Sequence, residues 1–269
     1  MVELDQSMLR QLQMTELELL LVVDHICKKN NIMYSLDGGT LLGAIRHQGF
    51  IPWDDDADVM MTRAEYDKFY EACKKDLDLE KYFLQEFRTD SEYRWGYSKM
   101  RKNGTVFLRE GQEHVKCHVG VCIDIFIFDK VPNGYIRRRL HWLSCFIIRK
   151  GLYSIVGQKK ENNIVYKRLY QLMALLPRSF WVNWLQRLVH RENGKEDELR
   201  SHLTYPNRKS IRYGLSYKYY EEYIEKEFEG HQLMVIKDYD RYLRELFDDY
   251  MQLPSENKRK IHPVSRIKL

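Results

Sequence analysis

Apolar residues near the start of the chain recur with the period of an amphipathic helix. Leu9, Leu12, Leu19 and Val23 fall close to a 3.6-residue repeat. This spacing predicts a helix over residues 8–29, with one face turned toward a core and the other toward solvent.

A short strand, a glycine turn and a second helix are expected next. The apolar segment 33–36 is a strand candidate, and the adjacent Gly38 and Gly39 favour a tight turn. Thr40 follows the glycines and is placed to cap a helix over 41–47.

The rest of the first half reads as strands, turns and one further helix. Val121 opens a strongly β-prone run, and Asn-Gly is the strongest short hairpin signal. The predicted elements are a loop over 49–55, a strand over 56–61, a helix from the Thr62–Glu65 capping box to Lys75, a hairpin joining 97–101 to 105–109 across Asn103-Gly104, and a strand over 121–128.

The character of the chain changes after Pro132. Residues 135–191 are basic and rich in Trp, Leu and Ile, which predicts helices, and a further helix is expected near 240–251 before a basic, polar tail that begins at Glu256. We therefore expect an α/β catalytic core over 1–131, a helical region over 132–212 and a C-terminal segment over 213–269 that packs back on the core.

Composition excludes two broad classes of protein. Hydrophobic residues make up 44% of the 269, which is too many for a disordered chain. The 44 Lys and Arg residues exceed the 39 Asp and Glu residues by a formal charge of only +5. A dedicated nucleic-acid binder carries a heavier basic stripe, so no nucleic-acid partner is expected, whereas a nucleotide or a lipid surface remains open.

Cysteine usage and the N-terminus indicate a cytoplasmic protein. The five cysteines are an odd number, and the first residues are polar, without the apolar core of a signal peptide. Reducing conditions and free thiols are therefore expected. The longest apolar run, 142–148, is far shorter than the roughly 20 residues of a spanning helix, which leaves a peripheral position on the inner face of the cell membrane open.

Four carboxylates gather within five positions. At short range Asp54, Asp55, Asp56 and Asp58 repel one another by about 1 kcal/mol per pair even in water, so a compensating cation is expected. Side chains alternate along a strand, which would place Asp56 and Asp58 on the same face. Two aligned carboxylates make half a site for a hard divalent ion, Mg²⁺ or Mn²⁺.

A third acid is expected on a neighbouring strand. Asp124 lies in the apolar run 121–128, where an unpaired carboxylate would cost several kcal/mol. It is therefore the natural third ligand of the divalent cation. Together these features, a strand, a Gly-Gly turn, a helix, a strand with Asp-x-Asp and another strand with Asp, have the layout of the nucleotidyltransferase fold.

Residues around the glycine turn are candidates for binding a phosphate. Gly38 and Gly39 allow a close backbone approach, and the helix start at Thr40 offers N–H groups that lack helical partners. Arg46 and His47 lie one or two turns further on and could reach the same anion.

The longest motifs resemble those of a known family. Gly39-Thr-Leu-Leu-Gly-Ala-Ile-Arg-His47 and Gly49-Phe-Ile-Pro-Trp-Asp-Asp-Asp-Ala-Asp58 are similar to the LicD family of phosphorylcholine transferases, which is related to the fukutin proteins. The similarity continues in 99–105, 123–126, 228–230, 239–243 and 249–254. One departure is Phe247-Asp248, where the family tends to have Tyr-Gly.

The resemblance implies a transferase that uses a CDP-linked donor, typically CDP-choline. Phosphocholine would pass to a hydroxyl of a cell-surface glycan, such as lipopolysaccharide or teichoic acid, or of its lipid-linked precursor, and CMP would leave. Metal ions on Asp56, Asp58 and Asp124 would clamp the diphosphate and activate the acceptor hydroxyl. The remaining implied contacts are Lys99 and Arg101 with the phosphates, and Trp53, Trp95 or Tyr97 with the quaternary ammonium.

Simpler interpretations of the same residues stay open. The acidic run could be a solvated loop or a Ca²⁺ site in which Asp54 and Asp55 only support the loop, and Asp124 could merely end a strand. The basic residues at 46–47 and 99–101 could be solvent-exposed. Rival functions are the transfer of another phosphoalcohol or of a nucleotidyl group on the same fold, and a non-catalytic binding subunit.

Two further patterns are weighed against simpler explanations. His114, Cys117, His118 and Cys122 suggest zinc, but paired Cys-x-x-Cys knuckles are absent, so a buried strand cysteine with loop histidines is the preferred reading. The helical region combines Trp, aliphatic and basic residues as interfacial helices do; the alternative is that these helices pack on the catalytic core.

Overall fold

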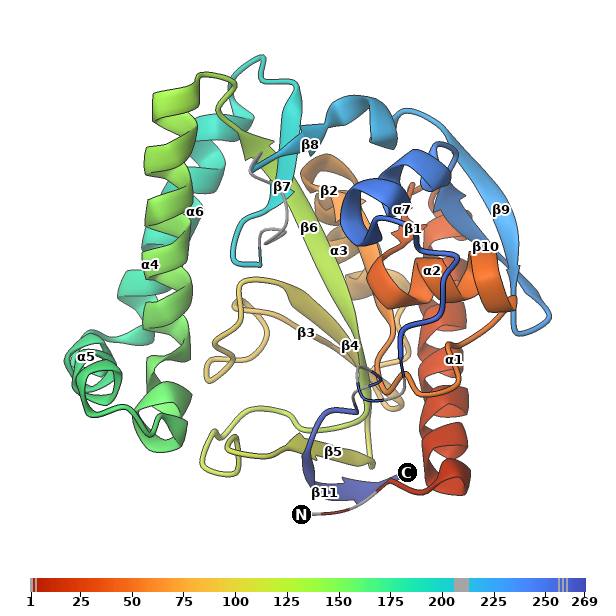
Figure 1. The fold of residues 1–269 in the computed structure, drawn as a ribbon, viewed down its shortest axis with the longest axis horizontal. Coiled ribbons are helices and arrows are strands. Elements are labelled where there is room, and N and C mark those ends of the chain that lie inside the picture. Colours follow the sequence, from red (N-terminus) through yellow and green to blue (C-terminus); the bar gives the residue numbers. More distant parts are fainter. Residues whose placement is uncertain (1, 3, 206–212, 256, 258, 260) are drawn as a thin grey trace.

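The computed structural model describes residues 2, 4–205, 213–255, 257, 259 and 261–269. It is a mixed α/β fold, as predicted, in which helices flank a central sheet on both sides (Figure 1). The sheet follows the order β1-β2-β6-β4-β3, and β7 and β8 extend it beside the second half of β6. Its strands are β1 Ser35–Leu36, β2 Asp58–Thr62, β3 Tyr82–Gln85, β4 Ser98–Lys102, β6 Cys122–Val131, β7 Leu199–His202 and β8 Leu215–Ser216.

Strand β6 is the axis of this sheet. It runs parallel to β2 and antiparallel to both β4 and β7. The predicted β-prone run therefore forms the longest strand, and its side chains alternate between the two faces. Asp124, near its start, is placed beside both β2 and β4.

The predicted N-terminal helices are confirmed. α1 (Gln6–Lys29) begins at Asp5, whose side chain accepts a hydrogen bond from the Met8 N–H at 2.8 Å. α3 (Arg63–Asp76) begins at Thr62, whose hydroxyl accepts from the Glu65 N–H, as a capping box requires. Both helices contact β6 and bury their apolar faces in a core that spans the sheet.

The second helix starts earlier than predicted. α2 (Gly38–His47) is capped by Asp37, so Gly38 and Gly39 lie in its first turn rather than in a separate turn. Gly38 has a positive φ of 52°, which glycine adopts readily. Thr40 is not the cap: its hydroxyl accepts a hydrogen bond from the Asp58 N–H at 2.8 Å, which fixes the start of β2 against the helix.

The predicted hairpin at Asn103-Gly104 is wrong. Gly104 has the positive φ of a turn, but the strands on its two sides do not pair with each other. β4 pairs with β3 and β6, whereas β5 (Val106–Arg109) pairs with β11 (Val264–Lys268) from the C-terminal tail. β5 therefore pairs with a distant strand in place of the local one, and part of the basic, polar tail that begins at Glu256 forms that strand.

The C-terminal segment also contains elements that the sequence did not reveal. η1 (Tyr217–Tyr220) is followed by the antiparallel pair β9 (Tyr223–Phe228) and β10 (His231–Ile236). α7 (Tyr239–Phe247) is shorter than the predicted helix over 240–251. Apolar residues of β10 and α7 join the core of the sheet, so this segment packs back on the N-terminal part of the chain.

The helical middle is confirmed. α4 (Tyr135–Lys160), α5 (Ile164–Ala174) and α6 (Arg178–Asn193) lie along one side of the sheet (Figure 1). Part of this region has its own core, built from residues such as Cys145, Ile148 and Trp181. Among the described residues, no helix is long and apolar enough to cross a membrane. The proposed division at 131 and 212 stays a prediction.

Candidate active site

The candidate site lies where β2, β4 and β6 meet at the start of α2. Asp58 and Asp124 are directly paired across the parallel strands β2 and β6, so their side chains share one face. Lys99 of β4 is the register partner of Asp124 from the other side. Its Nζ forms an ion pair with the Asp124 carboxylate, and each side chain is only 10% exposed.

Asp58 occupies the most acidic surroundings in this group. Burial and the neighbouring carboxylates of Asp56, Asp124, Asp37 and Asp54 raise the pKa of Asp58 well above its usual value. A Cβ added to Gly38 would lie 3.2 Å from Asp58 Oδ2. The glycine therefore lets the first turn of α2 approach the carboxylate closely.

Asp37 is a site residue that our sequence reasoning missed. Its side chain accepts from the Gly38 N–H at 2.8 Å and from the Tyr242 hydroxyl of α7 at 2.6 Å. Burial raises the pKa of Asp37, and these two hydrogen bonds partly oppose the rise. An Asp directly before a helix is a recognised cap signal, which could have identified the residue. Tyr242 lies in the family-like segment 239–243, but no local pattern indicates its contact with Asp37, which is 205 positions away in the chain.

The acidic loop before β2 packs tightly on α2. A Cβ at Gly39 would lie 2.5 Å from Asp54 Oδ2, so the Asp54 carboxylate would have to move to admit any side chain there. Burial and the carboxylates of Asp56 and Asp55 raise the pKa of Asp54 to about 8. Asp54 therefore belongs to the same charge cluster, close to the N-terminus of α2.

The sequence predicted that Asp56 and Asp58 are alternate residues of one strand, and this prediction is wrong. β2 begins at Asp58. Asp56 lies in the loop before this strand, where Arg109 and His262 contact its carboxylate. Arg109 Nη2 is 3.2 Å from Asp56 Oδ2, and His262 Nδ1 is 3.6 Å from the same oxygen. His262 also lies 2.9 Å from Asp55 Oδ1, and this hydrogen bond raises the pKa of His262.

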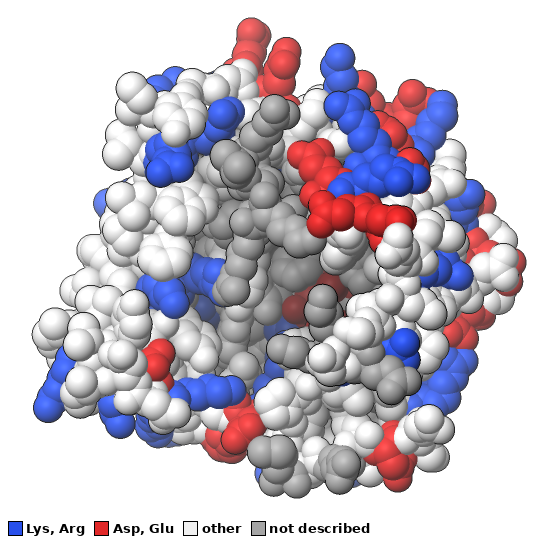
Figure 2. All heavy atoms as spheres, in the orientation of Figure 1, with Lys and Arg blue, Asp and Glu red and all other residues white. Residues whose placement is uncertain are grey.

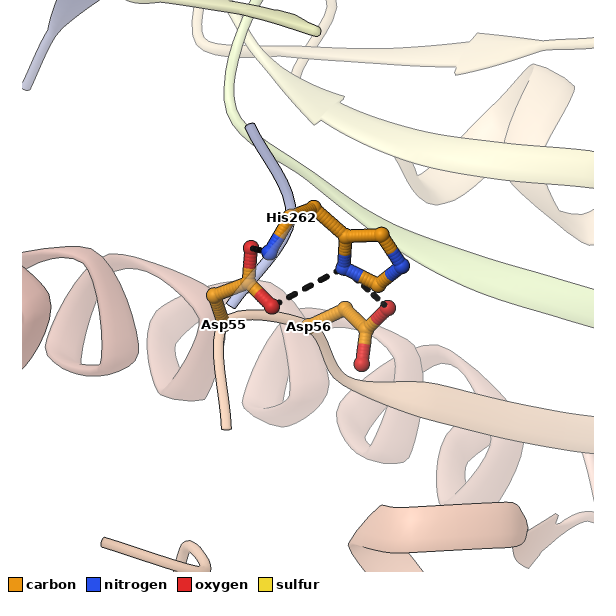
Figure 3. A group of neighbouring side chains, drawn as sticks. All are labelled: Asp55, Asp56 and His262. Carbon is orange, nitrogen blue, oxygen red and sulfur yellow. Dashed lines mark hydrogen bonds and ion pairs between the residues drawn. The ribbon is translucent and has the colours of Figure 1, made fainter. Parts of the chain in front are cut away.

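Figure 3 shows His262, from the C-terminal tail, against both carboxylates of the loop. Within the described part of the chain, Asp55, Asp56 and His262 are the group whose ligand atoms all lie within 4.8 Å of one another. His262 also donates its backbone N–H to Asp55 Oδ2 at 3.0 Å. These contacts hold the C-terminal tail against the acidic loop. No sequence motif predicts them, because the two segments are far apart in the chain.

The predicted metal ligands Asp56, Asp58 and Asp124 do not have their ligand atoms within 4.8 Å of one another among the described residues. The charges of the cluster nevertheless fit a divalent cation. Six aspartates meet here, at positions 37, 54, 55, 56, 58 and 124, against Lys99, Arg109 and His262. Arg109 and His262 act on the loop at 55–56, and Lys99 acts on Asp124. Burial and neighbouring carboxylates raise the pKa of Asp58, and a hard cation with oxygen ligands would offset this repulsion.

Four of the predicted substrate-binding residues make contacts within the protein. Arg46 donates to the carbonyl of Tyr250 at 2.6 Å, and the His47 ring lies edge-on to Trp53 with centroids 6.5 Å apart. Trp53 has the Arg259 guanidinium over its ring at 4.4 Å.

Arg101 is buried. It donates to the side chain of Gln85 and to the carbonyl of Gly120. Each of these four side chains thus has a partner inside the protein. Their predicted roles in substrate binding stay predictions.

An aromatic cavity adjoins the acids. Phe126 and Phe128 follow Asp124 at alternate positions of β6 and line a cavity of about 230 Å³ that reaches Asp37 and Gly38 at the start of α2. We name this the aromatic cavity; His202, Tyr205, Tyr242 and Phe247 also line it. Strand alternation in 124–128 could have indicated that an acid and two rings share one face, whereas His202 and Tyr205 come from the distant β7 region.

The zinc pattern does not assemble within the described ranges. His114 Nε2 lies 3.0 Å from the carbonyl of Ile155, and His118 Nε2 lies 3.0 Å from Asn103 Oδ1. Neither histidine belongs to a group of potential metal ligands there. Both histidines thus have hydrogen-bond partners within the protein, whereas Cys117 and Cys122 are half-buried rather than buried, as the preferred interpretation had it.

Comparison with known proteins decides the family. Residues 31–144 match the family model described as LicD/FKTN/FKRP, nucleotidyltransferase domain. The lipopolysaccharide cholinephosphotransferase LicD of Haemophilus influenzae is 31% identical over 269 residues, which cover 95% of this chain and 96% of that protein. The chain belongs to the LicD family of transferases. An uncharacterized protein of Rickettsia typhi is 30% identical over 139 residues, which cover 51% of this chain and 37% of that protein. The matched domain of this LicD protein holds Asp58, Asp124 and the start of α2.

Proposed function

We propose that the chain transfers phosphocholine from CDP-choline to a hydroxyl of a cell-surface glycan or its lipid-linked precursor and releases CMP, with the help of Mg²⁺ or Mn²⁺. The observation that carries the proposal is the register pairing of Asp58 with Asp124 beside the aromatic cavity. The similarity of the chain, over nearly its full length, to a lipopolysaccharide cholinephosphotransferase supports the choice of phosphocholine.

The acid cluster suits the diphosphate of such a donor when a divalent cation is bound. Asp58 and Asp124, with Asp56 from the loop, would hold the cation, which supplies positive charge to the phosphates and to the attacking oxygen. Phosphoryl transfer depends on position and neutralised charge rather than on a covalent residue. The Gly39 and Thr40 N–H groups at the first turn of α2 add donors for a phosphate oxygen.

The aromatic cavity suits the rest of the donor. A quaternary ammonium is attracted to ring faces, and a cytosine base stacks on them. Phe126, Tyr205 and Tyr242 bring such rings next to the start of α2. The donor would therefore have its diphosphate at the acids and an apolar or cationic end in this cavity.

Product analysis tests the proposal. The purified protein is incubated with CDP-choline, CDP-ethanolamine or CTP, with Mn²⁺ or Mg²⁺, and with glycan from the host. CMP release that needs the glycan and is fastest with CDP-choline is the expected result. Pyrophosphate release from CTP would show nucleotidyl transfer instead, and a faster reaction with another CDP-alcohol would change the donor. Donor binding with no turnover on any acceptor would indicate a binding protein.

We also propose that the helical region docks on an anionic membrane surface, where a lipid-linked acceptor would lie. α4 exposes Ile136, Leu140 and Leu143, which are spaced as one helical stripe. α5 buries only Tyr170, and its exposed side chains include Leu169 and Leu172.

Basic residues accompany these exposed apolar side chains. Arg137 and Arg139 are exposed on α4, and Arg168 is exposed on α5. An apolar surface bordered by Lys and Arg is typical of helices that lie in a membrane interface. The charge is complementary to acidic lipid headgroups rather than to a neutral surface.

Flotation with vesicles containing phosphatidylglycerol tests the docking. The protein is expected to float at low salt. A variant with Leu169→Glu and Leu172→Glu is expected to stay at the bottom, because each change places a charge on the apolar surface. Leu79→Glu is the matched control, since Leu79 is 66% exposed in a different part of the molecule. Docking is refuted if the protein never floats or if the double variant floats equally well.

A further inference from the structure

A second cavity shares Tyr205 with the aromatic cavity. It has a volume of about 280 Å³, and its lining includes Arg94, Arg149 and Lys150 but no carboxylate. We name it the cationic cavity. Trp95, Gly96, Leu152, Tyr153, Thr204 and Tyr205 complete its lining. Three positive side chains thus face one hollow that none of the acids of the active-site cluster enters.

The cations of this cavity lack acidic partners within the described part of the chain. Arg149 lies over the ring of Tyr205 at 4.1 Å, and Lys150 donates to the Tyr170 hydroxyl at 2.9 Å. Neither forms an ion pair among the described residues. The carboxylate that acts on Arg94 is the exposed Glu92.

Two buried polar atoms at the cavity also have no hydrogen-bond partner among the residues described. They are Nη1 of Arg94 and Oγ1 of Thr204. A buried donor without a partner costs free energy, which natural proteins rarely leave uncompensated. Thr204 is only 1% exposed, so its hydroxyl is fixed in position. Burial and the nearby Arg178 lower the pKa of Arg94, and Glu92 partly opposes this shift.

The two cavities are neighbours. Tyr205 lines both of them, and its ring meets the Tyr97 ring at a centroid distance of 5.7 Å. Lys99, the partner of Asp124, lies over that same Tyr97 ring at 5.2 Å. A short path of rings therefore joins the acid cluster to the cationic cavity. In Figure 2 blue Lys and Arg atoms lie on the side of the molecule that α4 occupies.

We propose that the cationic cavity binds a phosphate group carried by the acceptor, separate from the diphosphate of the donor. The acceptor part of this inference rests on the proposed transferase function. Arg94 and Arg149 supply forked guanidinium donors that match a phosphate, and the Thr204 hydroxyl supplies another. An acceptor anchored here would extend past Tyr205 and bring a hydroxyl toward the acids.

Calorimetric titration with inorganic pyrophosphate tests the binding site directly. It is carried out in EDTA, because without a divalent cation the acid cluster repels the probe whereas the cationic cavity attracts it. We expect Arg149→Gln and Arg94→Gln each to weaken binding about tenfold or more, since each removes a charge-assisted hydrogen bond. Arg149→Lys keeps the charge and is expected to retain much of the binding.

Arg187→Gln is the matched control, because it removes one exposed positive charge from α6, outside the cavity. It is expected to bind pyrophosphate within about twofold of the unaltered protein, as a distant surface charge is screened. The proposal is overturned if the unaltered protein gives no binding, or if the cavity variants bind as the control does. Circular dichroism and thermal unfolding of each variant separate loss of the site from loss of the fold.

Two further measurements separate the sources of the phosphate. In the transfer assay, Arg149→Gln should raise the KM for the acceptor and leave the KM for CDP-choline unchanged. If the variant instead loses only flotation on anionic vesicles, the cavity binds a lipid headgroup and the acceptor assignment is wrong. A protein that binds pyrophosphate through Arg94 and Arg149 but transfers nothing would contradict the proposed function while leaving the phosphate site intact.

Discussion

The hydrogen bond between Tyr242 and Asp37 links α7 to the start of α2, and Tyr242→Phe removes it together with a weaker contact from the hydroxyl to Met60 Sδ at 3.6 Å. The Tyr242 hydroxyl donates to Asp37 Oδ1 at 2.6 Å, and both side chains are buried. Phenylalanine keeps the ring and its packing in the core. The variant loses one donor to a buried carboxylate, which still accepts a hydrogen bond from the Gly38 N–H at 2.8 Å.

The expected cost follows from the charge of the acceptor. A hydrogen bond to a charged group contributes about 1.5–3 kcal/mol. For a chain of this size, a loss of about 2 kcal/mol lowers the unfolding temperature by about 4–8 °C. Urea and thermal unfolding followed by circular dichroism measure both values. Tyr166→Phe is the matched control, because Tyr166 is 58% exposed on α5 and its change should be nearly neutral.

The effect should grow with pH. Burial raises the pKa of Asp37 and the Tyr242 hydroxyl lowers it, so the variant has the higher pKa in the folded state. A carboxyl group whose pKa is higher folded than unfolded makes the folded state less stable as pH rises through that interval. The variant should therefore lose more stability at pH 8 than at pH 5. A loss below about 0.5 kcal/mol at both pH values, within the range of ordinary surface substitutions, would refute this account of Asp37.

Two further predictions concern the acidic loop. Gly39→Ala should lower the transfer rate at least tenfold, because its Cβ would lie 2.5 Å from Asp54 Oδ2 and displace this carboxylate. Small displacements of active-site groups lower catalytic rates strongly. Gly134→Ala is the control and should leave the rate unchanged, because a Cβ at Gly134 would meet open space. The pKa of Asp54 is about 8 in the folded protein, so the metal-free protein should lose up to about 1.4 kcal/mol of stability per pH unit between pH 5 and 8. Asp54→Asn should flatten this dependence, and an unchanged slope would contradict the assignment.

Local signals predicted much of the fold. The capping box at Thr62 and the apolar period of α1 identified their helices, because both depend on residues within a few turns. The hairpin at Asn103-Gly104 failed for the opposite reason. β5 found its partner in β11, more than 150 residues away, and no local pattern indicates such a pairing.

In the site, too, local patterns predicted some residues and long-range contacts placed the others. Asp58 and Asp124 were placed on one face by strand arguments, and the register bears that placement out. Asp56 was assigned to the same strand, but β2 starts two residues later and a loop residue follows no alternation rule. Arg109 and His262 reach the loop only through the pairing of β5 with β11, so they could not have been predicted before that pairing was known.

Direct measurement of Mn²⁺ binding tests the central claim, that the paired carboxylates of β2 and β6 hold a divalent cation. Electron paramagnetic resonance counts free Mn²⁺ as the protein is added. We predict that Asp58→Asn weakens binding at least tenfold with circular dichroism unchanged, since it removes a charged oxygen ligand. Glu221→Gln, an exposed acid outside the site, should bind as the unaltered protein does. Equal binding by the unaltered protein and Asp58→Asn would contradict the account.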